Sequence, residues 1–153
     1  MRRKFTSGPI RCLCFIESKN WLICGTDDLC ILTVDLTTFS ILEKKTTLDY
    51  PRCISVHPKK PLFIHSGDDL TSIIYNWETK ETSTIVKHCH YILASEFDPL
   101  DDEYFYTASL DQTIRRQYFK NPEEEEKKFT FTSGINSLRA LKNGKLIFGS
   151  DSM

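Results

Sequence analysis

The sequence contains little alanine, little valine and no long apolar run. Ala and Val occur only three times each among 153 residues. Because Ala is the strongest helix former, this composition argues against a helical bundle. The longest run without a polar side chain, Cys12–Ile16, has five residues and is too short to span a membrane. No apolar segment follows the basic start Arg2–Lys4, so we expect no secretory signal.

The chain also lacks an excess of either charge. Lys and Arg number 20 and Asp and Glu number 21, which gives a net charge of −1. Surfaces that bind nucleic acid usually carry a basic stripe, so we expect no nucleic-acid partner. No glycine-rich phosphate loop, nucleophile elbow or zinc motif is present. The sequence therefore predicts a soluble intracellular protein that is not an enzyme and has no cofactor or metal site.

Six cysteines would suit a disulfide framework, but the absence of a secretory signal favours reduced thiols. Five of them lie inside apolar or β-branched runs, where a free thiol behaves as a small hydrophobe. We therefore expect the cysteines to be buried structural residues.

The sequence is rich in β-forming residues arranged in a repeat. Thr, Ile, Val and the aromatic residues account for 50 positions. Residues 21–28, 62–69, 104–111 and 145–152 align without gaps, at spacings of 41, 42 and 41. Independent anchors, which open apolar runs at spacings of 41, 41 and 43, are Ile10, Pro51, Ile92 and Ile135. A period of about 40–45 residues is typical of the four-stranded blade of a β-propeller.

These anchors predict an all-β fold, a WD-repeat β-propeller fragment with about 3.5 blades of four-stranded antiparallel sheet. We expect a single partial propeller over 1–153. Its blades are expected at approximately 10–45, 51–87 and 92–132, followed by a half blade at 135–150. A closed propeller needs at least about four blades, so we expect an open arc with uncovered end blades. Such a chain is a fragment, closes by self-association, or completes another protein.

An aspartate recurs in the turns of the repeat. Ser109–Ile114 resembles the turn of a WD repeat, between the second and third strands of a blade. Its carboxylate can accept backbone N–H groups. We therefore predict structural roles in the blade turns for Asp28, Asp69 and Asp111.

The polar network that usually accompanies this turn is expected to be degraded. His88 stands where it can serve Asp111, but Thr47 takes the equivalent place one repeat earlier. Gln117 or Tyr118 replaces the Trp of the third blade. Each lost buried hydrogen bond costs about 1 kcal/mol. The sequence therefore predicts a marginally stable propeller fragment.

Five stretches occur in a characteristic order: Lys19-Asn20-Trp21, Gly25–Asp28, Asp49–Pro58, His88–Ile92 and Ala108–Ile114. Together they resemble the amino-terminal propeller of the coatomer β′ subunit family. The likeness covers about residues 5–150 and is most specific over 49–58. It implies blades two to four of that propeller and the start of the next.

That resemblance implies a non-enzymatic adaptor of the COPI vesicle coat, acting in Golgi-to-ER retrieval. The implied partners are other coatomer subunits and the dilysine tails of membrane cargo. The implied location is cytoplasmic and peripheral on Golgi and COPI vesicle membranes. By resemblance, Asp49 and Asp68 would receive the lysines, while Arg11 and Arg52 would bind the terminal carboxylate. Each of these residues could equally be an ordinary turn or surface residue.

Other functions stay open at this point. The chain could be a WD-repeat scaffold of another multiprotein complex, such as a ubiquitin-ligase receptor, or a truncated paralogue without function. The family's first blade and its helical solenoid have no counterpart in this sequence, which separates it from coat assembly as the family performs it. The acidic run 121–128 is expected to be a solvated loop between the third and fourth strands of blade three.

Overall fold

Tight turns after short β-rich runs fold the chain into successive antiparallel sheets. The computed structural model describes residues 4–120 and 125–151. The first sheet comprises β1 (Ile10–Ile16), β2 (Trp21–Thr26), β3 (Cys30–Asp35) and β4 (Ser40–Thr46), and the second β5 (Pro51–Val56), β6 (Leu62–Gly67), β7 (Thr71–Asn76) and β8 (Thr82–Lys87). The third comprises β9 (Ile92–Phe97), β10 (Tyr104–Ser109), β11 (Thr113–Tyr118) and β12 (Glu125–Thr130), and the last β13 (Ile135–Ala140) and β14 (Leu146–Ser150).

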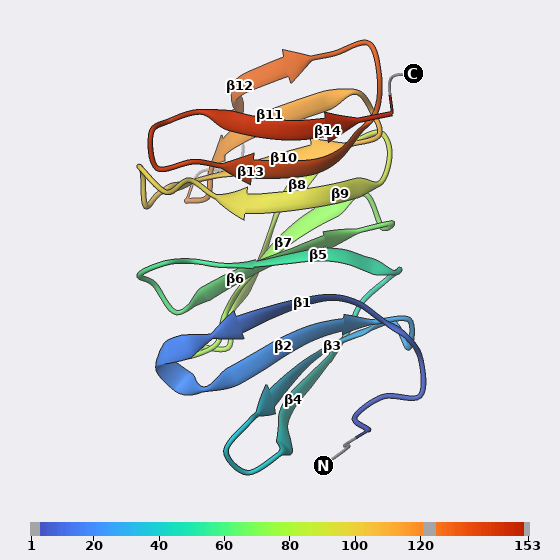
Figure 1. Ribbon diagram of the computed structural model, residues 1–153, viewed down its shortest axis with the longest axis vertical. Helices are drawn as coiled ribbons and strands as arrows, with labels where there is room; N and C mark the ends of the chain where they lie inside the picture. The colour runs from blue at the N-terminus through green and yellow to red at the C-terminus, as the bar shows by residue number, and fades with distance from the viewer. Residues whose placement is uncertain (1–3, 121–124, 152–153) are drawn as a thin grey trace.

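The sheets stack face to face as the blades of an open arc (Figure 1). Each strand pairs with the next one along the chain, and the innermost strands contact one another in the order β1, β5, β9 and β13. We number the sheets as blades one to four. The predicted all-β, partial propeller of about three and a half blades in an open arc is confirmed, since three sheets have four strands and the last has two.

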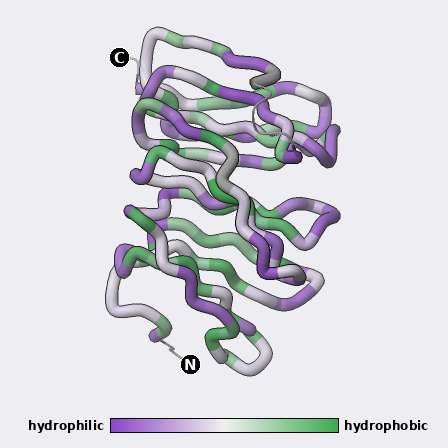
Figure 2. The backbone as a smooth tube through the Cα atoms, turned by 180° about the vertical axis from the view of Figure 1, so that it is seen from behind, coloured by the Kyte–Doolittle hydropathy of each residue, from purple (hydrophilic) through white to green (hydrophobic). Residues whose placement is uncertain are grey.

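The core lies between the blades rather than inside one of them. Ile16 and Ile23 of blade one pack against Phe63 of blade two, and all three side chains are buried. A similar cluster joins Ile64 of blade two to Phe105 of blade three. Both faces of such a middle strand are covered, so successive residues of β6, from Phe63 to Gly67, are buried rather than alternating with exposed ones. Hydrophilic residues gather at the turns (Figure 2).

The turn between the second and third strands has the same backbone form in each complete blade. Leu29, Leu70 and Gln112 all adopt positive φ, of 54°, 64° and 69°. A type I turn followed by one left-handed residue matches the twist of antiparallel strands. Gly67 ends β6 beside the backbone carbonyl of Tyr50, which a Cβ atom would strike. Only glycine therefore permits this close approach of β6 to the start of β5.

The expectation that the acidic run 121–128 is a loop needs correction. Residues 121–124 lie outside the described residues, but 125–128 begin strand β12 rather than a loop. Lys127 and Lys128 are exposed there, and the outer strand of a sheet tolerates charged side chains facing water.

The cysteines are less buried than expected. Only Cys24 and Cys30 are buried, while Cys89 is exposed, and the other three are half-buried. All six are free thiols. Burial nevertheless raises the pKa of Cys12 to about 12 and that of Cys53 to about 11, so both thiols stay protonated and unreactive. No helix in the described part of the chain is long and apolar enough to cross a membrane.

Candidate functional site

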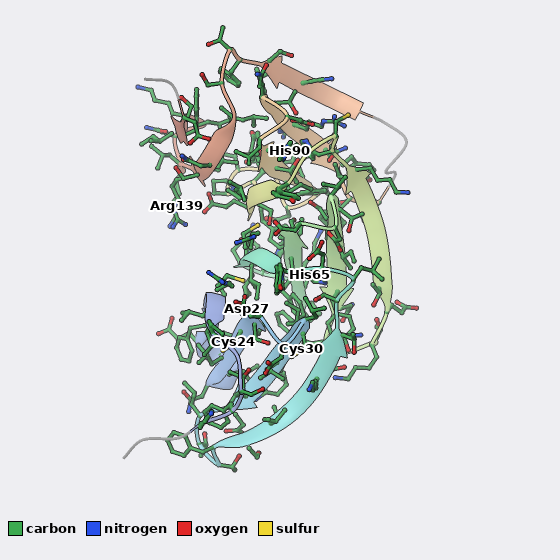
Figure 3. All side chains as sticks on the ribbon, turned by 90° about the vertical axis from the view of Figure 1, so that its right-hand side faces the viewer. Cys24, Asp27, Cys30, His65, His90 and Arg139 are labelled. Carbon is green, nitrogen blue, oxygen red and sulfur yellow. The ribbon has the colours of Figure 1, made fainter. Side chains whose placement is uncertain are left out.

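One rim of the arc, formed by strand ends from all four blades, contains the residues that the resemblance singles out. We call it the top rim: it consists of the starts of β1, β5, β9 and β13 and the ends of β2, β6, β10 and β14, which pair with them. Asp27 and His90 lie on this rim, which faces the viewer in Figure 3. At the start of every inner strand the register shifts by one residue, a β-bulge that redirects the extra side chain. The bulged residues are Arg11, Arg52, Leu93 and Asn136.

The bulge joins an arginine to an aspartate in blades one and two. Arg11 Nε and Nη2 donate to the two carboxylate oxygens of Asp27, both at 2.6 Å. Arg52 Nε donates to Asp68 Oδ1 at 2.8 Å, and its Nη2 donates to Asp68 Oδ2. Hydrogen bonding to the carboxylate raises the pKa of each arginine, and Arg11 lowers the pKa of Asp27. Both guanidinium groups are therefore held by bidentate ion pairs.

The pairing changes along the arc. Blade three has Leu93 and Leu110 at the equivalent places, so it carries no charge there. In blade four, Asn136 Nδ2 donates to Asp151 Oδ1 at 2.8 Å. The carboxylates of Asp27 and Asp151 were not singled out from the sequence as candidate site residues. The repeat could have revealed them, since Asp27 precedes Asp68 by one period of 41 residues.

The remaining predicted residue, Asp49, stands at the top rim between the two ion pairs in the sequence. It is half-buried, and its Oδ1 accepts the backbone N–H of Tyr50 at 2.8 Å. No residue of the described ranges forms an ion pair with Asp49. Tyr50 and Tyr91 are exposed one period apart, and the Arg52 guanidinium lies 5.8 Å from the Tyr50 ring centroid. The structure thus pairs Arg52 with Asp68 and Arg11 with Asp27. It leaves one carboxylate oxygen of Asp49 without a hydrogen bond from the described residues.

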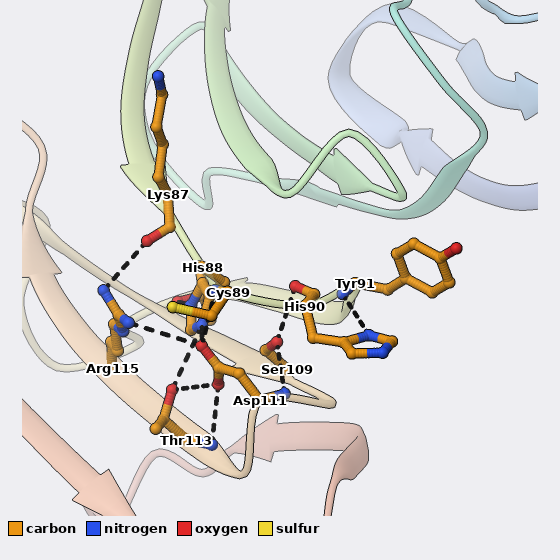
Figure 4. Close-up of polar contacts among 10 residues, drawn as sticks. Lys87, His88, Cys89, His90, Tyr91, Ser109, Asp111, Thr113 and Arg115 are labelled. Carbon is orange, nitrogen blue, oxygen red and sulfur yellow. Dashed lines mark hydrogen bonds and ion pairs between the residues drawn. The ribbon is translucent and has the colours of Figure 1, made fainter.

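The blade-three turn holds a connected polar network (Figure 4). His88 Nδ1 donates to Asp111 Oδ2 at 2.8 Å, and Thr107 Oγ1 donates to His88 Nε2 at 2.8 Å. The carboxylate partner assigns the proton to Nδ1. Asp111 also accepts the backbone N–H groups of Cys89 at 3.1 Å and Thr113 at 3.0 Å.

The charge states follow from these bonds. Burial alone would raise the pKa of Asp111, but the hydrogen bonds from Thr113, Cys89 and His88 lower it to about 2. Burial lowers the pKa of His88 despite the attraction of Asp111. A neutral imidazole therefore bridges an ionised carboxylate and a hydroxyl, which is an arrangement for stability rather than for proton transfer.

The other two turn aspartates make different contacts. Asp28 accepts Thr6 Oγ1–H and, at 3.0 Å, the backbone N–H of Ser7. These bonds, that of Thr6 foremost, lower the pKa of Asp28 to about 2. Asp69 accepts only the backbone N–H of Thr71, at 3.1 Å, among the described residues. The side chain of the turn aspartate therefore ties the turn to the preceding segment in blades one and three but not in blade two.

A pocket of about 670 Å³ lies on the rim opposite the top rim, between blades one and two. Two of the lysines that line it are engaged in ion pairs: Lys59 Nζ lies 2.9 Å from Asp102, and Lys60 Nζ lies 2.8 Å from Glu103. His57 Nδ1 accepts two backbone N–H groups, and Nε2 donates to the carbonyl of Asp102 at 3.0 Å. In the described ranges, no cluster of three His, Cys, Asp or Glu residues could hold a metal ion.

Comparison with known proteins agrees with the fold. The family model of the WD domain, G-beta repeat, matches residues 2–32. This stretch includes β1, β2 and the turn of Asp28. No curated protein matches the chain. The match over residues 2–32 and the four-stranded antiparallel sheets are consistent with a partial WD-repeat β-propeller in an open arc.

Proposed function

We propose that this WD-repeat scaffold binds the dilysine-ended cytoplasmic tails of membrane cargo on its top rim. The WD-domain match and the open arc of blades support the general role, a scaffold that presents surfaces to other proteins. The resemblance to coatomer β′ subunits, most specific over residues 49–58, supports the choice of ligand.

The repeated arginine–aspartate pairs carry this proposal. A lysine-ended tail has ammonium groups and a terminal carboxylate at fixed separation, so its site needs both charges. Asp49 offers a carboxylate oxygen. The Asp68 side chain is only 6% exposed and is paired with Arg52, so it offers only the lone pairs that Arg52 leaves unused at the rim surface. Each arginine uses Nε and Nη2 for its aspartate, and no described residue bonds Nη1. The Nη1 groups of Arg11 and Arg52 are thus donors for a terminal carboxylate.

A peptide titration tests the ligand. Three peptides would be compared by calorimetry: one ending in a dilysine motif, the same peptide amidated at its carboxyl end, and a version with both lysines replaced by serine. We expect at least about tenfold tighter binding of the first, because each lost charged contact costs about 1.5–3 kcal/mol. Equal binding of all three, or none, would overturn dilysine recognition.

Variants test the site. Asp49→Asn together with Asp68→Asn should remove the preference for lysine over serine, because both carboxylates become neutral. Glu17→Gln, on the rim opposite the top rim, is the matched control and should keep the preference. A double variant that folds and still prefers lysine would move the site elsewhere.

The same proposal assigns the protein to the cytoplasm, peripherally on Golgi and COPI vesicle membranes, together with other coatomer subunits. Purification of the tagged chain from cells, followed by detection of coatomer subunits, tests this assignment. Co-purification that persists in the aspartate double variant would indicate a scaffold contact separate from the cargo site. Recovery of the tagged chain without any coatomer subunit would reject the assignment.

A further inference from the structure

A smaller, polar pocket of about 370 Å³ also lies between blades one and two. It is lined by the end of β4 and the loop that follows it, and by residues of β6, β7 and β8. All of its lining residues lie between positions 44 and 82, inside two sheets that each have four paired strands. The shape of this pocket therefore depends on two complete blades and on no unpaired strand edge.

The pocket lies at the repeat position where blade three bridges loop and strand with His88. In blade three, the His88 ring donates to Asp111 and accepts from Thr107, so it joins the two (Figure 4). In blade two, Thr47 holds the loop position and His65 the strand position (Figure 3), and both line the pocket. Because a threonine side chain is shorter than a histidine side chain, the space between loop and strand stays open.

The polar side chains at the base of the pocket are buried without partners. His65 is 7% exposed and Thr47 is 9% exposed. Among the described residues, the His65 ring forms no hydrogen bond, and Thr47 Oγ1 has none either. Burial, together with the charge of Lys45, lowers the pKa of His65 to about 4, so at pH 7 the ring is neutral with one N–H donor. Buried polar groups are normally hydrogen-bonded, so two unpaired ones in one pocket point to a ligand.

A single cation faces these donors. Lys45 Nζ lies 3.9 Å from the centroid of the Tyr75 ring, and Lys45 forms no ion pair within the described ranges. The neighbouring carboxylate of Glu43 accepts the Tyr75 hydroxyl at 2.6 Å and lies 3.2 Å from Lys80 Nζ. Lys44 also borders the pocket, but side chains alternate along a strand, so it points to the other face of β4. The pocket therefore offers one positive charge and two neutral donors.

From this arrangement we propose that the pocket binds a carboxylate group on a short apolar stem. One carboxylate oxygen accepts a hydrogen bond from the Lys45 ammonium group, and the other accepts from the Thr47 hydroxyl and the His65 N–H. The stem contacts Leu48, which lines the pocket and is 85% exposed. A phosphate group, with a charge of about −1.5 to −2 at pH 7, would exceed the single positive charge. The proposal is independent of the cargo site, because it uses none of the four residues predicted there.

Small probes test the charge that the pocket selects. Butyrate carries a carboxylate on an alkyl stem, butyramide is its neutral counterpart, and propyl phosphate carries the larger charge. Nuclear magnetic resonance of the whole chain would record the amide signals of Thr47, Leu48 and Ile73, which line the pocket. We expect butyrate to shift these signals saturably and to bind at least about tenfold more tightly than the other two. Equal binding of butyramide, tighter binding of propyl phosphate, or no saturable shift at these amides would overturn the proposal.

A further probe identifies the source of the carboxylate. It is a tripeptide of alanine, glutamate and alanine, acetylated and amidated so that the glutamate side chain carries its only charge. Tighter binding than that of butyrate supports the site as a receptor for glutamate side chains, and weaker binding supports it as a receptor for free organic acids. Equal binding of the same peptide with glutamine would overturn carboxylate recognition.

Variants separate the site from the stability of the fold. Lys45→Met removes the charge and keeps the apolar stem, so it should weaken butyrate binding at least about tenfold. Lys142→Met, in the exposed turn of blade four, is the matched control and should bind normally. Thr47→His combined with His65→Thr places an imidazole in the pocket, as in blade three, and should abolish binding in a chain that still unfolds cooperatively. Unchanged butyrate binding in Lys45→Met or in this double variant would overturn the proposal.

Discussion

Blade two and blade three share a turn but satisfy its polar groups differently. In blade three, His88 precedes the blade and Thr107 lies on its second strand, and a chain of hydrogen bonds joins both to Asp111. In blade two the two residue types are exchanged, with Thr47 in the preceding loop and His65 on the strand. Thr47 Oγ1 is buried without a partner among the described residues.

The exchange teaches that position matters more than composition in such a network. A histidine spans the distance from the loop to both the turn carboxylate and the strand hydroxyl, because its two nitrogens lie on opposite sides of the ring. A threonine has a single hydroxyl group on a shorter side chain, so it cannot span the turn carboxylate and the strand in the same way. In blade one Thr6 does reach Asp28, and in blade two Thr47 does not reach Asp69.

The largest expected effect distinguishes the two turn aspartates. Asp111→Ala leaves His88 Nδ1 and the backbone N–H groups of Cys89 and Thr113 without an acceptor. We expect a loss of about 4 kcal/mol in the free energy of unfolding. Asp69→Ala removes one hydrogen bond and should cost about 1 kcal/mol. Urea denaturation measures both, and equal losses would contradict the comparison.

The second effect depends on pH. Burial lowers the pKa of His65 to about 4, below its ordinary 6.5. The unfolded chain therefore binds this proton more readily, so stability is complete above pH 6.5 and falls as the pH drops toward 4. The expected loss is about 3 kcal/mol over that range. Urea denaturation of His65→Leu alongside the wild type isolates this contribution, and parallel pH curves would show that His65 has no part in it.

A third variant restores the blade-three arrangement in blade two. Thr47→His combined with His65→Thr gives Asp69 a histidine donor and removes a buried unpaired hydroxyl. We expect a gain of about 2 kcal/mol in the free energy of unfolding. The reverse exchange in blade three, His88→Thr with Thr107→His, is the control and should destabilise. A destabilised blade-two variant would mean that backbone placement, rather than side-chain type, breaks the network there.

The smallest effect concerns single hydroxyl groups. Thr47→Val keeps the shape of the side chain and removes its unpaired oxygen, so it should stabilise by about 1 kcal/mol. Thr113→Val removes a hydroxyl that donates to Asp111 at 2.5 Å, and should destabilise by about 1 kcal/mol. Thermal unfolding compares the two. A shift of the same sign in both variants would refute the assignment of a partner to one and not to the other.

The fold was largely predictable because its signals are local and repeated. Each blade turn combines an aspartate with a short strand on either side, and the chain repeats this pattern every 41 or 42 residues. The contact of His88 with Asp111 was anticipated for the same reason. The start of β12 was missed because a run of charged residues is indistinguishable from a loop until its pairing with β11 is known.

The top rim was only partly predictable. The sequence named Arg11, Arg52 and Asp68 as candidate ligand contacts, which stays a prediction, but it did not indicate the pairing of Arg11 with Asp27. That pairing depends on a β-bulge at the start of each inner strand, which turns the extra residue toward the end of the neighbouring strand. No residue type announces such a bulge in the sequence, because it arises from the register between two strands.

The sequence by itself determined the period, the β character and the turns, since each follows from residues close together in the chain. The tertiary structure decided which charges meet on the top rim and which polar groups in the blades find partners. These outcomes depend on strand register and on the packing of one blade against the next. Both bring together residues about 16 to 40 positions apart, where a displacement of one residue exchanges every contact.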